Sequence, residues 1–399
     1  MVILKVSSNM TEKPRVASMD KTLEIFKAKH PEVEVKYKVY DFQTYTDTLK
    51  VNFSIGEGDD IVLVDDMRQQ LLMKNNFLMD MTDMIKQNKW NEKLIPGAID
   101  FFNVRTPGRY YSIPVTMGPV LAFYNKNILE KLNLSVPKTM DDFNHMLDTA
   151  KKAGYIPIEN GGMNNFQMLW AVYQMILGRV SFEDVKKWYY LKGTTPAMEE
   201  AWKYAFETIS QWAKKGYFRE NMSSIDYNHL VEYYAKGESL ILFLGDWDLA
   251  TIEATGVSTG VFMLPKTNAD LPENTIVNSP DGAWALNSDL SVEKKTAAED
   301  FIDIFMQPEN AEIWTKNGFT TTVKFDVSKV DLSPLRKEFN SVLQNTSVGF
   351  YLDNPSESLL ETFIRQTGHL LGKRISSKEC YEQINAEYER IKSFKTPEK

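Results

Sequence analysis

The chain has 399 residues, and its 46 Lys and Arg against 54 Asp and Glu give a formal net charge of −8. This acidic balance, with no block of basic residues, argues against nucleic acid and anionic membranes as partners. Hydrophobic residues make up 43% and charged residues 25% of the chain, which excludes intrinsic disorder over most of its length. The single cysteine, Cys380, excludes internal disulfides and multi-cysteine metal sites, and the four histidines are isolated in sequence. No cofactor and no metal ligands are therefore predicted.

The first third of the chain alternates between strand and helix patterns. Residues 2–6 are a short apolar run, residues 33–39 alternate as a half-buried strand does, and residues 61–64 are a run typical of a strand buried on both faces. Helical spacing of apolar residues separates these runs, which predicts an open α/β sheet with right-handed crossovers. Ligands bind beyond the carboxyl ends of such strands, which places Ser7–Met10 and Asp65–Asp66 at the binding edge.

The rest of the chain is richer in helix patterns. Thr139 and Asp142 have the spacing of a capping box and predict a helix start. Further helices are predicted over residues 166–177, 197–214 and 226–236, and strands over residues 240–244, 260–264 and 283–286. No repeat or long linker is present, which favours a two-lobed body with short connections between the lobes.

Catalytic motifs are absent from the sequence: there is no Gly-x-Ser-x-Gly elbow, phosphate-binding glycine loop, His-Glu-x-x-His or dinucleotide fingerprint. The tryptophans differ in their surroundings. Trp247 follows a buried strand and a glycine and lies between two acids, so it is predicted to stack on a sugar ring. Trp284 fits a site and the core about equally well. The others are expected to pack in the core: Trp170, Trp188, Trp202, Trp212 and Trp314.

Several segments together resemble one known family. Gly108–Pro114 matches its G-x-x-Y-x-x-P pattern, Phe123–Leu129 contains its Tyr-Asn-Lys, Val136–Phe143 matches its P-K-T-W-x-E, and Gly237–Trp247 is similar to its G-x-x-A-M-x-x-x-G-x-W. Met140 replaces the usual tryptophan of this pattern. The chain thus resembles the carbohydrate-binding extracellular solute-binding proteins of ABC importers (family 1, maltose-binding-protein-like).

The resemblance implies a two-lobed α/β fold of the periplasmic-binding-protein type II class, with the ligand cleft between the lobes and three hinge crossings. The crossings are expected near Ile113–Val115, Phe262–Pro265 and Asn310–Thr315. The expected N-terminal lobe is residues 1–112 with 264–314, and the C-terminal lobe is residues 113–263 with 315–399. The implied function is to bind a sugar, most simply an oligosaccharide, outside the cell and to deliver it to permease subunits, with hinge closure and no catalysis.

The resemblance also implies ligand-binding residues at the strand ends and beyond the first crossing. Trp247 is the most specific of these, because the family's other binding residues vary with the ligand. The expected ligand-binding set is Asn9, Asp65, Asp66, Thr116, Asn165, Phe166, Trp247, Asp281, Gly282 and Tyr351.

Two alternatives stay open. Asp65 or Asp66, opposite Asp281 and near a sugar-stacking tryptophan, could instead be the catalytic carboxylates of a glycoside hydrolase or lyase. The same fold could bind a non-sugar solute: a peptide, a polyamine, or a ferric ion held by tyrosines, although adjacent tyrosines on a strand point to opposite faces.

The expected location is the surface of a Gram-positive bacterium, with the protein held as a monomeric lipoprotein whose signal and lipidated cysteine are missing from this sequence. In a Gram-negative bacterium the location would be the periplasm. If Met1 is the native start, the protein is instead cytoplasmic.

Overall fold

The computed structural model describes residues 1–95, 98–103, 106–162, 166–271, 274–344, 346–353 and 355–394. The described part divides into two compact units, each made of segments that are separate in sequence. Unit 1 consists of residues 1–118 and 279–332, and unit 2 of residues 119–278 and 333–399. Among the described residues, no helix combines the length and the apolar character needed to span a membrane.

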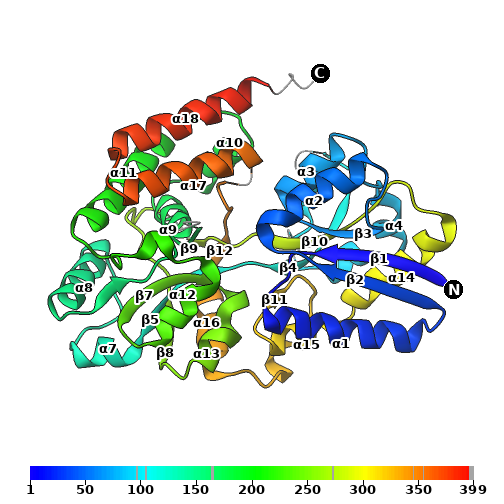
Figure 1. Cartoon of the computed structure of the whole chain (residues 1–399), viewed down its shortest axis with the longest axis horizontal. Coiled ribbons are helices and arrows are strands. Elements are labelled where there is room, and N and C mark those ends of the chain that lie inside the picture. Colours follow the sequence, from blue (N-terminus) through cyan, green and yellow to red (C-terminus); the bar gives the residue numbers. More distant parts are fainter. Residues whose placement is uncertain are drawn as a thin grey trace. The chain divides into compact units, whose positions relative to one another are not determined.

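Unit 1 is built on a six-stranded sheet with the strand order β11-β4-β10-β3-β1-β2 (Figure 1). Strands β1, β2 and β3 run parallel, as their sequence patterns predict, while β10 runs antiparallel to both β3 and β4. Its strands are β1 (Val2–Ser8), β2 (Val33–Val39), β3 (Ile61–Val64), β4 (Ser112–Met117), β10 (Pro280–Leu286) and β11 (Thr320–Thr321). Its helices are α1 (Lys13–Lys29), α2 (Phe42–Ser54), α3 (Asp66–Met73), α4 (Thr82–Gln87), α5 (Trp90–Lys93), α6 (Asp100–Asn103), α14 (Val292–Phe305) and α15 (Pro308–Lys316).

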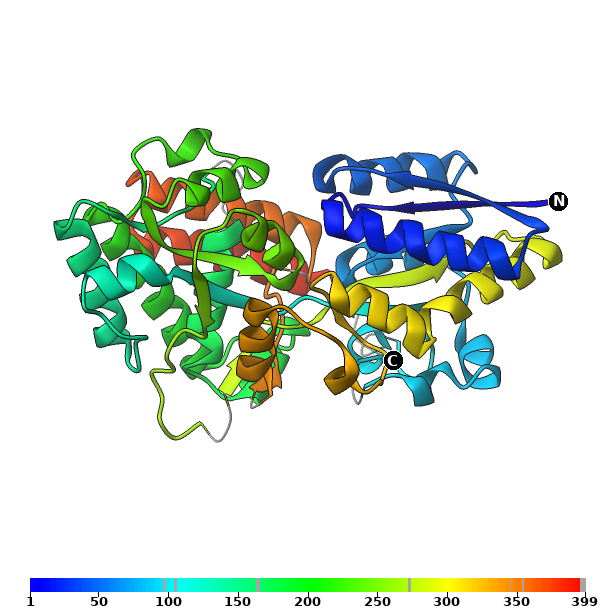
Figure 2. The ribbon, with the colours of Figure 1, turned by 90° about the horizontal axis from the view of Figure 1, so that it is seen from below.

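Helices cover both faces of the unit 1 sheet. Strand β10 shows this, since its successive side chains point to opposite faces of the sheet. Ala283 and Ala285 belong to the apolar cluster that includes α2 residues such as Phe53. Trp284, between them, packs edge-on against Phe301 and Phe305 of α14. Helix α1 packs against α14 and α15 beside the sheet (Figure 2). Trp284 is therefore a core residue.

Unit 2 contains a four-stranded sheet with the order β6-β7-β5-β8 and a parallel pair, β12-β9. Its strands are β5 (Val120–Asn125), β6 (Ile156–Ile158), β7 (Ser239–Gly245), β8 (Thr259–Phe262), β9 (Asn274–Ile276) and β12 (Thr346–Val348). Its helices are α7 (Lys126–Lys131), α8 (Met140–Lys152), α9 (Phe166–Leu177), α10 (Phe182–Tyr189), α11 (Pro196–Lys214), α12 (Tyr227–Ala235), α13 (Leu249–Ala254), α16 (Pro334–Leu343), α17 (Glu357–Leu371) and α18 (Ser377–Ser393).

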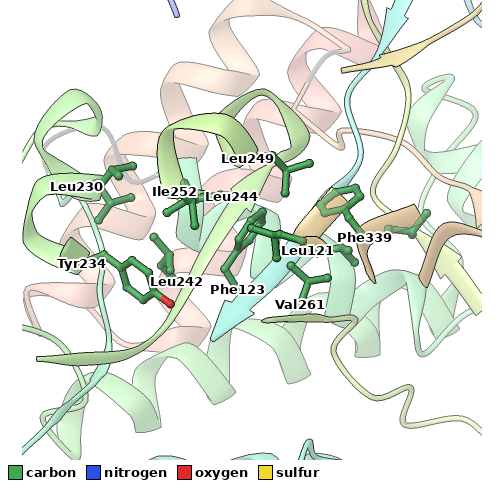
Figure 3. Packing of buried hydrophobic residues seen from close by; sticks show 13 residues of the cluster. Leu121, Phe123, Leu230, Tyr234, Leu242, Leu244, Leu249, Ile252, Val261 and Phe339 are labelled. Carbon is green, nitrogen blue, oxygen red and sulfur yellow. The ribbon is translucent and has the colours of Figure 1, made fainter. Parts of the chain in front are cut away.

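The core of unit 2 joins residues that are far apart in sequence. Phe123 of β5, Leu242 of β7, Val261 of β8 and Phe339 of α16 belong to one buried cluster (Figure 3). The predicted capping box also forms: the Asp142 backbone N–H donates to Thr139 Oγ1 at 3.0 Å, and the Thr139 N–H donates to the Asp142 carboxylate at 2.9 Å. These hydrogen bonds lower the pKa of Asp142. The tryptophans predicted for the core are buried: Trp170, Trp188, Trp202, Trp212 and Trp314.

The chain passes between the units at Gly118–Pro119, Asn278–Ser279 and Leu332–Ser333, which corrects the expected crossings and lobe boundaries. The first lies just beyond Ile113–Val115, because β4 continues within unit 1. At the second, the Thr267 N–H donates to the Gly178 carbonyl and β9 pairs with β12, which keeps the chain in unit 2 well past Phe262–Pro265.

The expected third crossing, Asn310–Thr315, falls inside helix α15 of unit 1. Thr22 of α1 donates to Asn310 Oδ1 at 2.7 Å, and Trp314 Nε1 donates to Thr22 Oγ1 at 3.1 Å. These buried hydrogen bonds hold α15 on α1, so the chain leaves unit 1 only after Leu332.

Cys380 gives a simple test of the packing of α18. Its side chain is buried, and this burial raises the pKa of the thiol to about 12. Since the thiolate is the reactive form, we expect iodoacetamide at about pH 8 to leave the native protein unmodified. In guanidinium chloride the same reagent should modify one thiol per chain, measured by mass spectrometry. Rapid labelling of the native protein would contradict the packing of α18.

Candidate functional site

The structure brings six of the predicted residues to one edge of the unit 1 sheet. Asn9 follows β1 and Asp65 follows β3, and these parallel strands end at the same edge. Strand β10 is antiparallel to β3 and begins there, and β4 ends there, so Gly282 lies opposite Thr116. The six residues are Asn9, Asp65, Asp66, Thr116, Asp281 and Gly282.

Thr116 and Asp281 carry oxygen atoms for which the described residues provide no hydrogen-bond partner. Thr116 is buried, and its Oγ1 has no hydrogen-bond partner in the described part of the chain; the same is true of Asp281 Oδ1. The other oxygen of Asp281 forms an ion pair with Arg15, whose guanidinium lies 5.3 Å from the centroid of the Phe319 ring. A side chain at Gly282 would approach Thr116 Oγ1 to 3.0 Å. This edge therefore carries hydrogen-bonding oxygen atoms, and the absence of a side chain at Gly282 leaves space beside Thr116 Oγ1.

Asp65 has a local role that the sequence prediction did not assign. Its Oδ1 accepts from the Arg68 backbone N–H at 2.7 Å, which caps helix α3, and its Oδ2 accepts from the Arg68 guanidinium at 2.6 Å. Asp66 is buried and accepts from Gln70 at 3.0 Å. The aspartate at position i and the arginine at i+3 could have suggested this role in the sequence.

In unit 2, Trp247 follows β7 and is only 9% exposed. Its Nε1 donates to the Tyr227 hydroxyl at 2.7 Å, and that hydroxyl donates to Asp248. The ring of Trp170 meets Trp247 edge-on, with centroids 5.6 Å apart. A Cβ built on Gly245 would lie 2.3 Å from the indole, so the ring rests against the Gly245 backbone. We call Trp170, Tyr227, Trp247 and Asp248 the aromatic–acid group.

A buried ion pair lies directly beside this group. Arg336 of α16 donates to Asp246 Oδ2 at 3.4 Å, and both side chains are buried. Burial lowers the pKa of the Arg336 guanidinium, and the nearby Asp246 carboxylate opposes this shift. Asp246 directly precedes Trp247, so this pair holds the residue next to the one that carries the indole.

The remaining predicted residues belong to unit 2 or lie outside the described residues. Phe166 is half-buried at the start of α9, and Tyr351 is buried after Phe350, which stacks between Phe182 and Tyr189. Asn165 lies outside the described residues. Two buried amides that the sequence did not single out, Asn160 and Gln167, have no hydrogen-bond partner among the described residues.

The described residues contain no group of three or more His, Cys, Asp or Glu that could hold a metal ion. The adjacent Tyr233 and Tyr234 do not form a paired site. Tyr234 is buried and lies 3.0 Å from Thr259 Oγ1, while the Tyr233 ring lies under Arg219 and Lys236.

A cavity of about 370 Å³ in unit 2 is lined by residues that include Asn125, Lys131, Tyr155 and Gly237. Gly237 precedes β7 whereas Trp247 follows it, so this cavity is at the other end of the strand from the aromatic–acid group.

Comparison with known proteins identifies relatives and similar structures. A "Probable sugar-binding periplasmic protein" of Mesorhizobium japonicum is 28% identical over 211 residues, which are 51% of this chain and 49% of that protein. An sn-glycerol-3-phosphate-binding periplasmic protein of Rhizobium meliloti is 25% identical over 63% of this chain and 55% of its own length. The chain thus spans about half the length of these curated relatives.

Two solved structures share the fold over almost the whole chain. A chitin oligosaccharide binding protein superposes with a TM-score of 0.87 at 19% identity, covering 98% of this chain and 99% of that one. A solute-binding protein, RafE, in complex with raffinose superposes with a TM-score of 0.78 at 17% identity, covering 98% and 100%. These likenesses confirm the predicted two-lobed solute-binding fold.

A family model described as bacterial extracellular solute-binding protein matches residues 21–329, which is more than half of the chain. The match confirms the family resemblance of the sequence motifs. It is a family of binding proteins and not of enzymes, in agreement with the expected absence of catalysis. The chain belongs to the family of bacterial extracellular solute-binding proteins.

Proposed function

We propose that this protein binds an oligosaccharide outside the cell and delivers it, chemically unchanged, to the permease of an ABC transporter. The observation that carries the proposal is the aromatic–acid group, in which Trp247, Tyr227 and Asp248 form one hydrogen-bonded chain at the end of β7. An indole face suits the C–H face of a sugar ring, and a carboxylate accepts strongly from sugar hydroxyls. The names of a curated relative and of both similar structures refer to sugars, which supports this choice of solute.

Unit 1 supports the proposal with its own polar edge. Thr116 Oγ1 and Asp281 Oδ1, which lack partners among the described residues, suit hydroxyl donors of a ligand. The proposed ligand-binding residues remain those expected from the sequence: Asn9, Asp65, Asp66, Thr116, Asn165, Phe166, Trp247, Asp281, Gly282 and Tyr351.

The proposal also includes the setting in which the protein acts. A monomer tethered by an N-terminal lipid to a Gram-positive surface would stay close to its permease, and ligand binding would favour hinge closure about the three crossings. The reading frame of the gene tests the tether. A frame that starts at Met1, without a preceding apolar segment and cysteine, would contradict it.

Thermal unfolding with a panel of sugars tests the proposed binding. We expect raffinose or a chito-oligosaccharide to raise the unfolding temperature in a saturable way, because a ligand at 100 times its Kd adds about 2.7 kcal/mol to the free energy of unfolding. Calorimetry then gives the Kd, and chromatography after overnight incubation should recover the sugar uncleaved. Failure of every glycan to bind would contradict the proposal, and a cleaved product would favour a glycoside hydrolase.

A further inference from the structure

Two buried side-chain amides in unit 2 have no hydrogen-bond partner among the described residues. Asn160 is 0% exposed and Gln167 is 1% exposed, and in both the amide oxygen and the amide nitrogen are unpartnered. A buried polar group without a partner costs about 1–3 kcal/mol of stability. Most buried polar groups are hydrogen-bonded, so two unpartnered amides in one unit call for a physical reason.

Asn160 lies at the end of the sheet that carries the aromatic–acid group. Strand β6 runs parallel to β7, and the Glu159 N–H donates to the Ile241 carbonyl, so Asn160 comes next at the carboxyl end of the sheet. The neighbouring Gly161 lies close to the backbone of Asp226, which precedes Tyr227.

Gln167 lies on helix α9, which also carries Trp170 of the aromatic–acid group. Trp170 follows it by three residues, so the two side chains share one face of the helix. The Trp170 ring meets both Trp247 and Tyr227 edge-on. Trp170 and Trp247 are only 8% and 9% exposed.

The guanidinium beside the aromatic–acid group, that of Arg336, is paired with a carboxylate. Arg336 binds Asp246, which directly precedes Trp247. The Arg219 guanidinium lies toward the other end of β7, where it binds Glu159 at 2.8 Å and Glu238, the residue before the strand, at 3.2 Å. A phosphate at the aromatic–acid group would therefore meet a guanidinium that a carboxylate already compensates. An amide, by contrast, offers both a donor and an acceptor, as a sugar hydroxyl does.

We propose that Asn160 and Gln167 recognise hydroxyl groups of a neutral sugar, and that this end of unit 2 selects against phosphorylated ligands. The inference rests on the proposed sugar-binding function and deepens it. It also separates this chain from its relative that is named for sn-glycerol-3-phosphate.

Apolar substitutions of similar shape test this role. Removing an unpartnered amide should leave the ligand-free protein equally stable or more stable, because no hydrogen bond is lost and an uncompensated polar group disappears. We expect Asn160→Leu and Gln167→Met to keep or raise the unfolding temperature without ligand. Each should raise the Kd for the sugar that the wild-type protein binds by about tenfold or more, measured by calorimetry.

Gln174 provides a matched control on the same helix. It is also buried, but its Nε2 donates to the Thr275 carbonyl at 2.9 Å and its Oε1 accepts from the Val277 N–H at 3.1 Å. Gln174→Met breaks both hydrogen bonds, so it should lower the unfolding temperature and leave the sugar Kd unchanged. The opposite responses of Gln167 and Gln174 distinguish ligand recognition from a structural role.

The outcomes separate this inference from the function on which it rests. If the wild-type protein binds no glycan, the proposed function fails. If it binds a sugar and both Asn160→Leu and Gln167→Met keep the wild-type Kd, or lose stability as Gln174→Met does, the amides are structural and the inference is overturned. Sn-glycerol-3-phosphate should not compete with the sugar; competition at similar concentrations would overturn the selection against phosphate.

Discussion

Trp247→Ala is expected to raise the Kd for the bound sugar by about tenfold to a hundredfold, or to abolish binding. The Trp247 indole is the proposed stacking face of the aromatic–acid group, and its Nε1 donates to the Tyr227 hydroxyl at 2.7 Å. Removing it deletes the proposed stacking face and also takes away the Nε1 donor to the Tyr227 hydroxyl, which in turn donates to Asp248. Calorimetry with the sugar found in the thermal screen measures the change.

Because Trp247 is largely buried, the alanine variant should also lose roughly 3–5 kcal/mol of stability, so a second variant is needed. Gly245→Ala keeps the indole but places a Cβ where the ring now lies, 2.3 Å from its nearest atoms, so the ring must move. It should weaken binding as well. Trp202→Phe, in the core of the same unit, should lower stability and leave the Kd unchanged. Wild-type affinity in both Trp247→Ala and Gly245→Ala would show that the sugar does not contact this group.

The sequence predicts most of the elements of both units, because their signals are local. Both faces of the strand Ile61–Val64 are buried, so all of its residues are apolar. Such a continuous apolar run is typical of a buried strand and can be recognised in the sequence. Thr139 marks a helix start because the capping hydrogen bonds join residues three apart in sequence. The strand ends of unit 1 follow from the parallel order, so Asn9 and Asp65 could be placed at one edge in advance.

The crossings between units could not be predicted in the same way. In the sequence, the turn at Pro265 suggests that the chain leaves unit 2 there. The chain stays in unit 2 because β9 pairs with β12, about seventy residues later. No local sequence signal indicates this pairing. Asn160 and Gln167 were missed for a related reason. Whether a buried amide is satisfied depends on its neighbours in space, so Gln167 and Gln174 look alike in sequence although, in the described part of the chain, only Gln174 has partners.

Asp246→Ala is expected to destabilise unit 2 by about 3–5 kcal/mol, because it leaves the Arg336 guanidinium buried without its nearest carboxylate. Glu253 contributes less to the field at that guanidinium. The loss is measured as a lower midpoint of urea unfolding. Sugar affinity should fall too, since Asp246 precedes Trp247.

The double variant Asp246→Ala/Arg336→Met provides the decisive comparison. Replacing a buried ion pair by apolar side chains is often neutral, whereas removing one partner is not, so the double variant should be more stable than Asp246→Ala alone. In a double-mutant cycle the two changes should couple by about 0.5–3 kcal/mol, as contacting residues do. Losses that simply add would show that the two charges do not stabilise each other, and the pair would then have no part in holding the strand end from which Trp247 projects.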